Sequence, residues 1–258
     1  MGIMELKVIA YARNGHTDKF GIPRQSREQS PILTRIVFEP EYRIAEALRG
    51  IEGYSHLWLI WGFHKGEREE WSPTVRPPRL GGNKRMGVFA TRSPFRPNPI
   101  GLSSVKLLKV ESRKSKDASC SLELLVSGAD LLDGTPIYDI KPYLSFSDSH
   151  EDAKNGFAEE TKDYRLTVDW GDVSVITHES PGNHPLITRL SRAFWSKKEA
   201  QKSEEECIKE DLEYILSQDP RPGYQDDPER EYKLDYGGRT VTFQVKNDVV
   251  YVKNMEKS

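Results

Sequence analysis

The sequence predicts a mainly β protein, with an N-terminal β-barrel followed by a smaller α+β domain. Short strand-like runs recur between Gly- and Pro-containing turns, and a single clear helical stretch accompanies them. This pattern favours an antiparallel or mixed barrel. The chain has no regular βαβ alternation and no GxGxxG motif, which argues against a doubly wound sheet.

Seven strands are expected in the N-terminal part. The first ends at the Asn14-Gly15 turn signal, and the most apolar one, Ser55–His64, is expected to be central and buried on both faces. Two later strands, joined by a charged turn, predict a hairpin. A helix is expected to begin at Pro40 and to end near Gly50 or Gly53. The expected strands are Leu6–Ala12, Arg35–Phe38, Ser55–His64, Gly87–Thr91, Leu102–Val110, Cys120–Val126 and Ile137–Ile140.

An acidic stretch at 147–163 marks a linker or exposed loop, so we expect two domains, 1–146 and 147–258. Beyond it, 183–195 is weakly helical and basic. Residues 203–216 predict a helix with Ser203 as its N-cap and acidic residues in its first turn. Three strands follow, at Tyr232–Tyr236, Thr240–Val245 and Val249–Val252, with turns at 237–238 and 247–248.

The overall composition fits a globular protein, because 36% of the 258 residues are hydrophobic and 30% are charged. The two cysteines are far apart, the six histidines are scattered, and no metal-ligand spacing occurs, so no metal is expected. The longest apolar run, Leu57–Phe63, is too short to span a bilayer. Without a recognisable secretory signal, we expect a soluble, reduced, cytoplasmic protein.

The forty residues from Trp71 to Val110 carry eight basic side chains and no acidic one, although the whole chain has 38 Lys+Arg against 40 Asp+Glu. Such a local positive field attracts phosphates or nucleic acid. Six prolines in the stretch exclude helix and central strand for much of it, so its arginines are expected on stiff loops. The basic residues are Arg76, Arg79, Lys84, Arg85, Arg92, Arg96, Lys106 and Lys109.

Within this stretch, the loop 91–101 places Arg92, Arg96 and Asn98 among three prolines. One interpretation is a surface loop whose arginines are solvated or paired with acids. The other is an anion or nucleotide site, because the arginine fork suits phosphates and asparagine can pair with the edge of a flipped adenine. Composition does not name a reaction.

Three further features have both a structural and a functional interpretation. His64, at the end of the apolar strand, is more often a satisfied core or rim histidine than a reactive one. Asp133, in the turn 130–136, is either ordinary turn chemistry or a ligand for amino or hydroxyl groups of a small molecule. Arg221 and Tyr224 either form a structural turn or grip a phosphate and stack a base.

Five motifs together closely resemble the TrmO-type (YaeB/TsaA-like) tRNA methyltransferases, and the similarity resumes at Gln218–Tyr224. Residues 147–200 are longer and more acidic than the family pattern. The motifs are Glu52–Trp58, Pro73–Gly82, Met86–Ser93, Phe95–Gly101 and Asp133–Tyr143.

The resemblance implies an S-adenosylmethionine-dependent enzyme with a non-Rossmann β-barrel, acting as a homodimer on N6 of threonylcarbamoyl-adenosine at tRNA position 37. Arg96 and Asn98 would line the reacting centre, and His64 or water would take the proton of N6. The anticodon arm would lie on Arg76, Arg79, Lys84, Arg85, Arg221 and Tyr224. The cofactor would contact Pro23, Arg24, Gln25, Phe63, His64, Arg92, Leu102, Leu132, Asp133, Gly134 and Thr135.

A cationic sulfonium also suits aromatic faces and the Asp133 carboxylate better than a ring of arginines. Two other functions stay open at this point. The barrel could hold RNA or a nucleotide without catalysis, or the enzyme could methylate another acceptor with the same cofactor.

Overall fold

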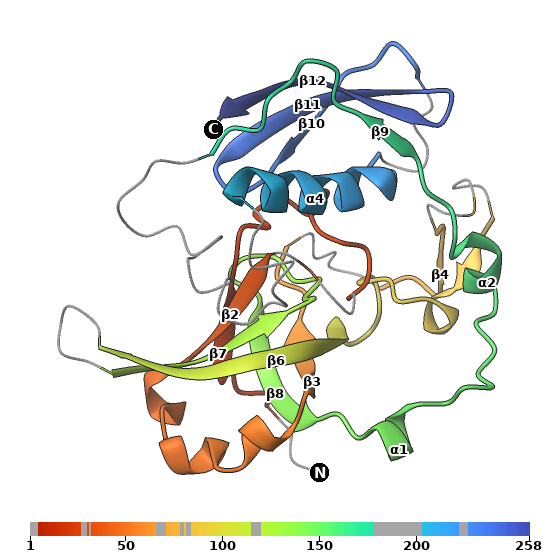
Figure 1. The fold of residues 1–258 in the computed structure, drawn as a ribbon. Coiled ribbons are helices and arrows are strands. Elements are labelled where there is room, and N and C mark those ends of the chain that lie inside the picture. Colours follow the sequence, from red (N-terminus) through yellow and green to blue (C-terminus); the bar gives the residue numbers. More distant parts are fainter. Residues whose placement is uncertain are drawn as a thin grey trace.

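The computed structural model describes residues 5–26, 30, 32–65, 71–77, 80, 84–114, 120–177, 203–221 and 227–258. Two bodies of β structure account for most of these residues. A barrel forms the N-terminal part, and a smaller sheet with the long helix α4 lies beside it, as Figure 1 shows. The predicted mainly β class, with a barrel followed by an α+β unit, is confirmed.

Within the described residues the barrel closes from six strands in the order β1-β2-β7-β6-β3-β8, and every neighbouring pair is antiparallel. Closure leaves no strand edge open for pairing with another chain. The predicted hairpin is β6 and β7, with a register shift between Leu107 and Lys109. The strands are β1 (Ala10–Arg13), β2 (Leu33–Phe38), β3 (His56–Gly62), β6 (Ile100–Lys114), β7 (Cys120–Ser127) and β8 (Pro136–Pro142).

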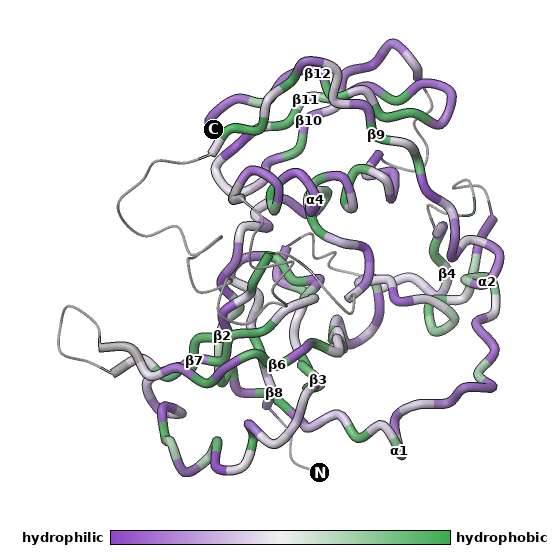
Figure 2. The backbone as a smooth tube through the Cα atoms, viewed as in Figure 1, coloured by the Kyte–Doolittle hydropathy of each residue, from purple (hydrophilic) through white to green (hydrophobic). Residues whose placement is uncertain are grey.

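Strand β3 lies between β6 and β8, but every strand of a closed barrel has two neighbours, so β3 is no more central than the others. The expectation that it is buried on both faces is wrong. Leu57, Leu59 and Trp61 are buried in the barrel core, whereas Trp58 and Ile60 on the other face are partly exposed. A closed barrel fills its interior from one face of each strand, and the opposite face meets loops and solvent. Hydrophobic and hydrophilic residues accordingly alternate along the barrel strands in Figure 2.

The helix expected from Pro40 is instead three short 3-10 helices: η1 (Pro40–Tyr42), η2 (Ala45–Leu48) and η3 (Ile51–Gly53). Gly50 adopts a left-handed backbone with φ of 88°, which ends the helical path before η3. Leu48 and Ile51 pack against the barrel core, but Ile44 is 53% exposed. The apolar residues between Pro40 and Gly53 therefore lie on separate short turns and do not form one face of a single helix.

Two of the expected strands also differ from the structure. The first strand begins at Ala10 and not at Leu6, because Ala10 is the first residue in register with both β2 and β8. The segment 87–91 is not a strand. A two-residue strand β5 (Met86–Gly87) pairs with β4 (Thr74–Val75), and a 3-10 helix η5 (Val88–Ala90) follows.

The C-terminal sheet has the order β10-β11-β12-β9. Three of its strands lie at the predicted runs, although β12 extends beyond the predicted end at Val252. They are β10 (Tyr232–Asp235), β11 (Arg239–Lys246) and β12 (Val249–Lys257). The predicted turns hold positive φ at Gly237, Gly238, Asn247 and Asp248. The short edge strand β9 (Thr167–Asp169), parallel to β12, was not predicted, since three residues carry too little alternation to detect.

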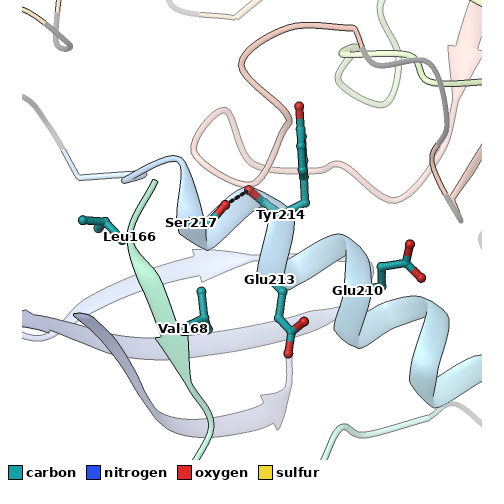
Figure 3. Close-up of a pocket in the computed structure, with 6 residues that line it drawn as sticks. All are labelled: Leu166, Val168, Glu210, Glu213, Tyr214 and Ser217. Carbon is teal, nitrogen blue, oxygen red and sulfur yellow. Dashed lines mark hydrogen bonds between the residues drawn. The ribbon is translucent and has the colours of Figure 1, made fainter. Parts of the chain in front are cut away.

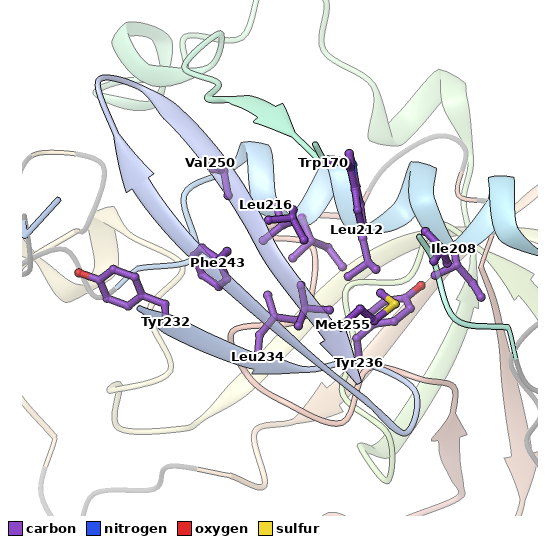
Figure 4. Packing of buried hydrophobic residues seen from close by; sticks show 14 of the residues in the cluster. Trp170, Ile208, Leu212, Leu216, Tyr232, Leu234, Tyr236, Phe243, Val250 and Met255 are labelled. Atoms are coloured by element: carbon purple, nitrogen blue, oxygen red, sulfur yellow. The ribbon is translucent and has the colours of Figure 1, made fainter. Parts of the chain in front are cut away.

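Helix α4 (Glu204–Ser217) begins as predicted, with Ser203 and Glu206 forming a reciprocal capping box. Its apolar side chains face the C-terminal sheet, as Figure 4 shows for Ile208, Leu212 and Leu216. Ile32, from just before β2, completes this core. On the same buried face of the helix, the side chain of Asp211 contacts both Tyr236 of the C-terminal unit and His16 of the N-terminal part. Helix α4 therefore joins the two β bodies.

The chain that connects the two bodies contains the short helices α1 (Ser145–Asp148) and α2 (Ala158–Thr161). Most side chains of the acidic stretch are exposed, as expected of a linker. Residues 183–195, expected to be weakly helical, lie outside the described residues. In the part of the chain that the structure describes, no helix is long and apolar enough to cross a membrane.

Candidate active site

A chain of polar side chains crosses three elements at the barrel. The indole Nε1–H of Trp61 on β3 donates to the hydroxyl oxygen of Ser103 on β6, at 2.9 Å. The Ser103 hydroxyl in turn donates to Oδ1 of Asp130, at 2.5 Å. Asp130 lies in the loop between β7 and β8. An indole nitrogen can only donate and an ionised carboxylate can only accept, which determines the direction of both hydrogen bonds.

Asp130 is partly buried, and burial raises the pKa of its carboxyl above the ordinary value of 3.8. The Ser103 hydroxyl, the backbone amide of Ser26 and the charge of Arg92 act in the opposite direction. Arg92 itself is exposed, and its Nη1 donates to Oε1 of Gln25 at 2.5 Å. The loop 23–26, Arg92 and Asp130 are thus brought together from three distant parts of the sequence.

The turn 132–135 packs on the end of β1. The backbone N–H of Asn14 donates to Oδ1 of Asp133 at 3.0 Å, and Arg13 Nη1 lies 3.7 Å from Asp133 Oδ2. The N–H of Asp133 donates to the carbonyl of His16 at 2.8 Å. Gly134 has φ of 80°, a backbone conformation that favours glycine. Asp133 therefore has the structural role in a turn that was one of its two interpretations, because its carboxylate accepts from a backbone amide. The carboxylate also pairs with Arg13.

Phe63 and His64 connect this turn to the polar chain. Nδ1 of His64 lies 3.4 Å from the hydroxyl of Thr135, which is buried. The ring of Phe63 meets that of Trp61 edge-on, with centroids 4.5 Å apart. The N–H of Phe63 donates to the Pro99 carbonyl at 3.0 Å. Most of the expected cofactor residues therefore form one continuous cluster.

The remaining residues of the loop 91–101 adjoin this cluster. Nη1 of Arg96 donates to the carbonyl of Thr91 at 3.1 Å, so this arginine stabilises its own loop. Asn98 is exposed, and Leu102, on β6 beside Ser103, is 55% exposed. The stiffness expected from the prolines is thus accompanied by internal hydrogen bonds.

Arg24 makes a different connection. Its Nε donates to the carbonyl of Gln218 at 2.9 Å, its Nη2 donates to the carbonyl of Asp219, and its backbone N–H donates to the Gln218 side chain at 3.0 Å. Pro23, its neighbour, is buried. The loop 23–26 is therefore attached to the end of α4 as well as to the barrel.

Of the residues expected to hold RNA, Arg76, Lys84 and Arg85 are exposed, and Arg85 Nη1 donates to the hydroxyl of Thr74 at 2.8 Å. Arg221 forms a two-bond pair with Asp219, at 2.8 and 2.9 Å, and its side chain is only 12% exposed. Arg79 and Tyr224 lie outside the described residues.

Sequence reasoning missed four residues of this region. Trp71 and Phe89 are 50% and 72% exposed and stack with ring centroids 6.4 Å apart. The guanidinium of Arg96 lies over Phe89, 6.0 Å from the ring centroid. Aromatic residues inside a basic stretch were the signal that would have identified this pair. Asp130 and Ser103 offered no such signal, because they are 27 positions apart and meet only through the barrel.

A surface hollow lies elsewhere, on the C-terminal unit between α4 and β9, where Leu166, Val168, Glu210, Glu213, Tyr214 and Ser217 line it (Figure 3). Its two glutamates would repel a phosphate backbone. It shares no residue with the cluster around Asp130, so we do not place the chemistry there. Among the described residues, no group of three or more His, Cys, Asp or Glu could hold a metal ion.

Comparison with known proteins identifies two family domains in this chain. The model of the tRNA-methyltransferase O N-terminal domain matches residues 11–149, and that of the TrmO C-terminal domain matches residues 185–258. The first match includes the barrel and the cluster around Asp130.

Two relatives and a solved structure agree with these matches. The chain is 37% identical to the tRNA (adenine(37)-N6)-methyltransferase of Escherichia coli strain K12, over 87% of this chain and 85% of that one. It is 37% identical to a putative S-adenosylmethionine-dependent methyltransferase, RcsF, of Pseudomonas aeruginosa, over 87% and 85%. A crystal structure of TrmO from Pseudomonas aeruginosa superposes with a TM-score of 0.67 at 30% identity, covering 99% of this chain and 100% of that one.

Proposed function

The chain belongs to the TrmO family of tRNA methyltransferases, and from this premise we propose that it methylates N6 of adenosine 37 in tRNA, using S-adenosylmethionine. The finer substrate we propose is threonylcarbamoyl-adenosine at that position, next to the anticodon. The observation that carries the proposal is the single cluster formed by Gln25, Arg92, Asp130 and the turn 132–135 at the barrel.

The residues present fit S-adenosylmethionine. When bound, this molecule supplies a methyl group on a positively charged sulfur. Phe63 offers an aromatic face and Asp133 a carboxylate, both suited to a cation. Gly134 has a positive φ and no side chain, so a ligand can approach its backbone closely. The proposed holding residues are Pro23, Arg24, Gln25, Phe63, His64, Arg92, Leu102, Leu132, Asp133, Gly134 and Thr135.

Arg96 and Asn98 are proposed to line the reacting centre. Their loop is stiffened by Pro94, Pro97 and Pro99, so a bound adenosine meets groups that need little further ordering. Positioning alone supplies a large share of the rate of a group transfer. For the proton that leaves N6, the sequence left two candidate acceptors, water and His64, and the structure holds His64 beside Thr135.

The tRNA is proposed to lie over the basic stretch. Arg76, Lys84 and Arg85 are exposed and match a phosphate backbone in charge. The stacked pair Trp71 and Phe89 offers an aromatic surface to an unpaired base of the anticodon loop. Arg79, Arg221 and Tyr224 complete the proposed RNA surface.

We propose that residues 1–146 carry the transfer site and that residues 147–258 support it through α4. The hydrogen bonds of Arg24 to Gln218 and of His16 to Asp211 support this division. A homodimer is proposed from the family resemblance, and light scattering of the purified protein tests it. A tRNA substrate and reduced cysteines are consistent with a cytoplasmic enzyme.

Mass spectrometry of nucleosides tests the reaction. tRNA carrying threonylcarbamoyl-adenosine is incubated with the protein and S-adenosylmethionine, then digested. The expected result is one added methyl group on that nucleoside, strongly reduced in Arg92→Ala and retained in Arg49→Ala, an exposed arginine outside the basic stretch. If S-adenosylmethionine gives no heat in calorimetry while an anticodon stem-loop binds tightly, a non-catalytic RNA-binding role replaces the proposal. If another nucleoside gains the methyl group, the acceptor is wrong.

A further inference from the structure

Asp130 occupies a distinctive place in the described part of the molecule. It lies in the loop between β7 and β8, beside Arg92 and the Ser26 amide, where the expected cofactor segments converge. Asp133, the other carboxylate of its turn, pairs with Arg13 and the Asn14 amide, whereas Asp130 accepts from the Ser103 hydroxyl and the Ser26 amide and faces the charge of Arg92. It remains partly exposed. Nothing in the family resemblance assigned it a role.

N6-methylation of an adenosine derivative leaves a proton to be removed. The new bond forms between N6 and the methyl carbon while the carbon–sulfur bond breaks and its electron pair stays on sulfur. N6 then carries one proton too many. A positioned base that takes this proton speeds such steps by about 10²–10⁴-fold, and it works best when its pKa is tuned towards the operating pH.

We propose that Asp130 is the catalytic base, and that the proton leaving N6 passes to an oxygen of its carboxylate and from there to solvent after product release. This inference rests on the proposed function and deepens it. Trp61 and Ser103 are positioning residues, since the indole donates to Ser103 and Ser103 donates to Asp130. They hold the carboxylate in one orientation and leave it able to accept a proton.

The surroundings of Asp130 suit this role better than those of the other candidates. Burial raises the pKa of its carboxyl and so strengthens it as a base. Arg92 is the charged side chain that faces it, whereas Ser103, Trp61 and the Ser26 amide are uncharged. Asp211 is fully buried and cannot meet a substrate. His64, 3.4 Å from the Thr135 hydroxyl in the turn expected to contact the cofactor, is assigned to the cofactor in this proposal.

Single-turnover methyl transfer to tRNA that carries threonylcarbamoyl-adenosine tests the proposal. Wild type, Asp130→Asn, Asp130→Glu, Ser103→Ala and His64→Ala are compared across pH, with calorimetry of S-adenosylmethionine binding for each. Asp139→Asn, an exposed aspartate on β8, is the matched control. For the wild type we expect the rate to rise with pH through an ascending limb, because only the ionised carboxylate accepts a proton.

Asp130→Asn is expected to bind S-adenosylmethionine like the wild type, to lower the rate constant by about 100-fold or more, and to lose the ascending limb. Asp130→Glu recovers part of the rate. Ser103→Ala keeps the limb but moves it to higher pH, since the lost hydrogen bond favoured the ionised form. His64→Ala keeps the limb in place, and Asp139→Asn behaves as the wild type.

Three results would overturn the proposal. If Asp130→Asn keeps both the rate and the ascending limb of the pH–rate profile, Asp130 is not the base. If His64→Ala loses that limb, His64 is the base. Lost binding of S-adenosylmethionine in Asp130→Asn would make Asp130 a ligand-holding residue. In all three cases the wild type still methylates the tRNA, so the proposed function stands. A wild type that methylates no adenosine removes both proposals together.

Discussion

Asp130 at the barrel loops and Asp211 on α4 are both withdrawn from solvent, yet their surroundings differ. Asp211 is completely buried and is met by the Tyr236 hydroxyl at 2.8 Å, the Ser30 hydroxyl at 3.2 Å and Nε2 of His16 at 3.1 Å. Asp130 is partly exposed, and among the described residues Ser103 is its one side-chain hydrogen-bond donor, with the Ser26 amide beside it.

This difference distinguishes Asp211, a carboxylate with a structural role, from Asp130, the carboxylate proposed to take part in the reaction. A buried charge stays in a protein when hydrogen-bond donors surround it, and a surrounded carboxylate has no capacity left for a substrate. The partners of Asp211 come from both β bodies, so this residue holds them together. Asp130 also accepts hydrogen bonds, from Ser103 and the Ser26 amide, but it stays partly exposed and can meet a substrate. Four predictions test this contrast, beginning with the largest expected effect.

Replacing Asp211 with Ala is expected to lower the free energy of unfolding by about 3–5 kcal/mol, because it leaves buried polar partners without their acceptor. Chemical denaturation followed by circular dichroism measures this. Glu205→Gln, an exposed change on the same helix, is the control. A loss as small as that of the control would show that Asp211 does not join the two bodies.

Replacing Gly101 with Ala is expected to disturb the Asp130 side of the comparison. A Cβ atom at this position would collide with the Trp61 indole, which donates to Ser103. Overpacking of this kind costs about 1–3 kcal/mol. We expect a lower melting temperature and slower methyl transfer, whereas Gly53→Ala, which meets open space, leaves both unchanged. Normal transfer by Gly101→Ala would show that the orientation of Trp61 is unimportant.

Replacing Phe89 with Ala is expected to weaken binding of an anticodon stem-loop by about 1–3 kcal/mol, the usual contribution of one aromatic–base stack. Affinity for S-adenosylmethionine should not change, because Phe89 lies outside the cluster around Asp130. Fluorescence anisotropy at two salt concentrations measures the RNA affinity, with Phe146→Ala, an exposed phenylalanine on α1, as control. Equal affinities for the two variants would remove Trp71 and Phe89 from the RNA surface.

The smallest effect concerns Asp148, which joins α1 to the barrel. The Leu144 N–H and the Trp58 indole both donate to its carboxylate and lower its pKa below 3.8. A lowered folded pKa means that this contribution to stability is present above the ordinary aspartate pKa and disappears as pH falls through the folded value. We expect Asp148→Asn to be slightly less stable near neutral pH and to show a shallower acid transition. An acid transition identical to that of the wild type would contradict the assignment.

Local features of the chain predicted much of the architecture. Alternating apolar residues indicated the β6–β7 hairpin and the three C-terminal strands, and Ser203 with its acidic first turn marked the start of α4. The Pro40 helix and the Gly87–Thr91 strand were wrong. In both, apolar spacing suited regular structure, but Gly50 and the two-residue pairing of Met86–Gly87 ended it locally.

The sequence by itself determined the strand pattern, the basic stretch with its proline-stiffened arginines, and the family motifs, since all of these depend on residues close together in the chain. Only the tertiary structure decided which polar groups meet. Ser103 reaches Asp130 across 27 positions and His16 reaches Asp211 across 195. The first contact depends on strand register and barrel closure, and the second depends on how α4 packs against the N-terminal part. The partners, the burial and the pKa direction of a carboxylate therefore emerge only in the complete fold.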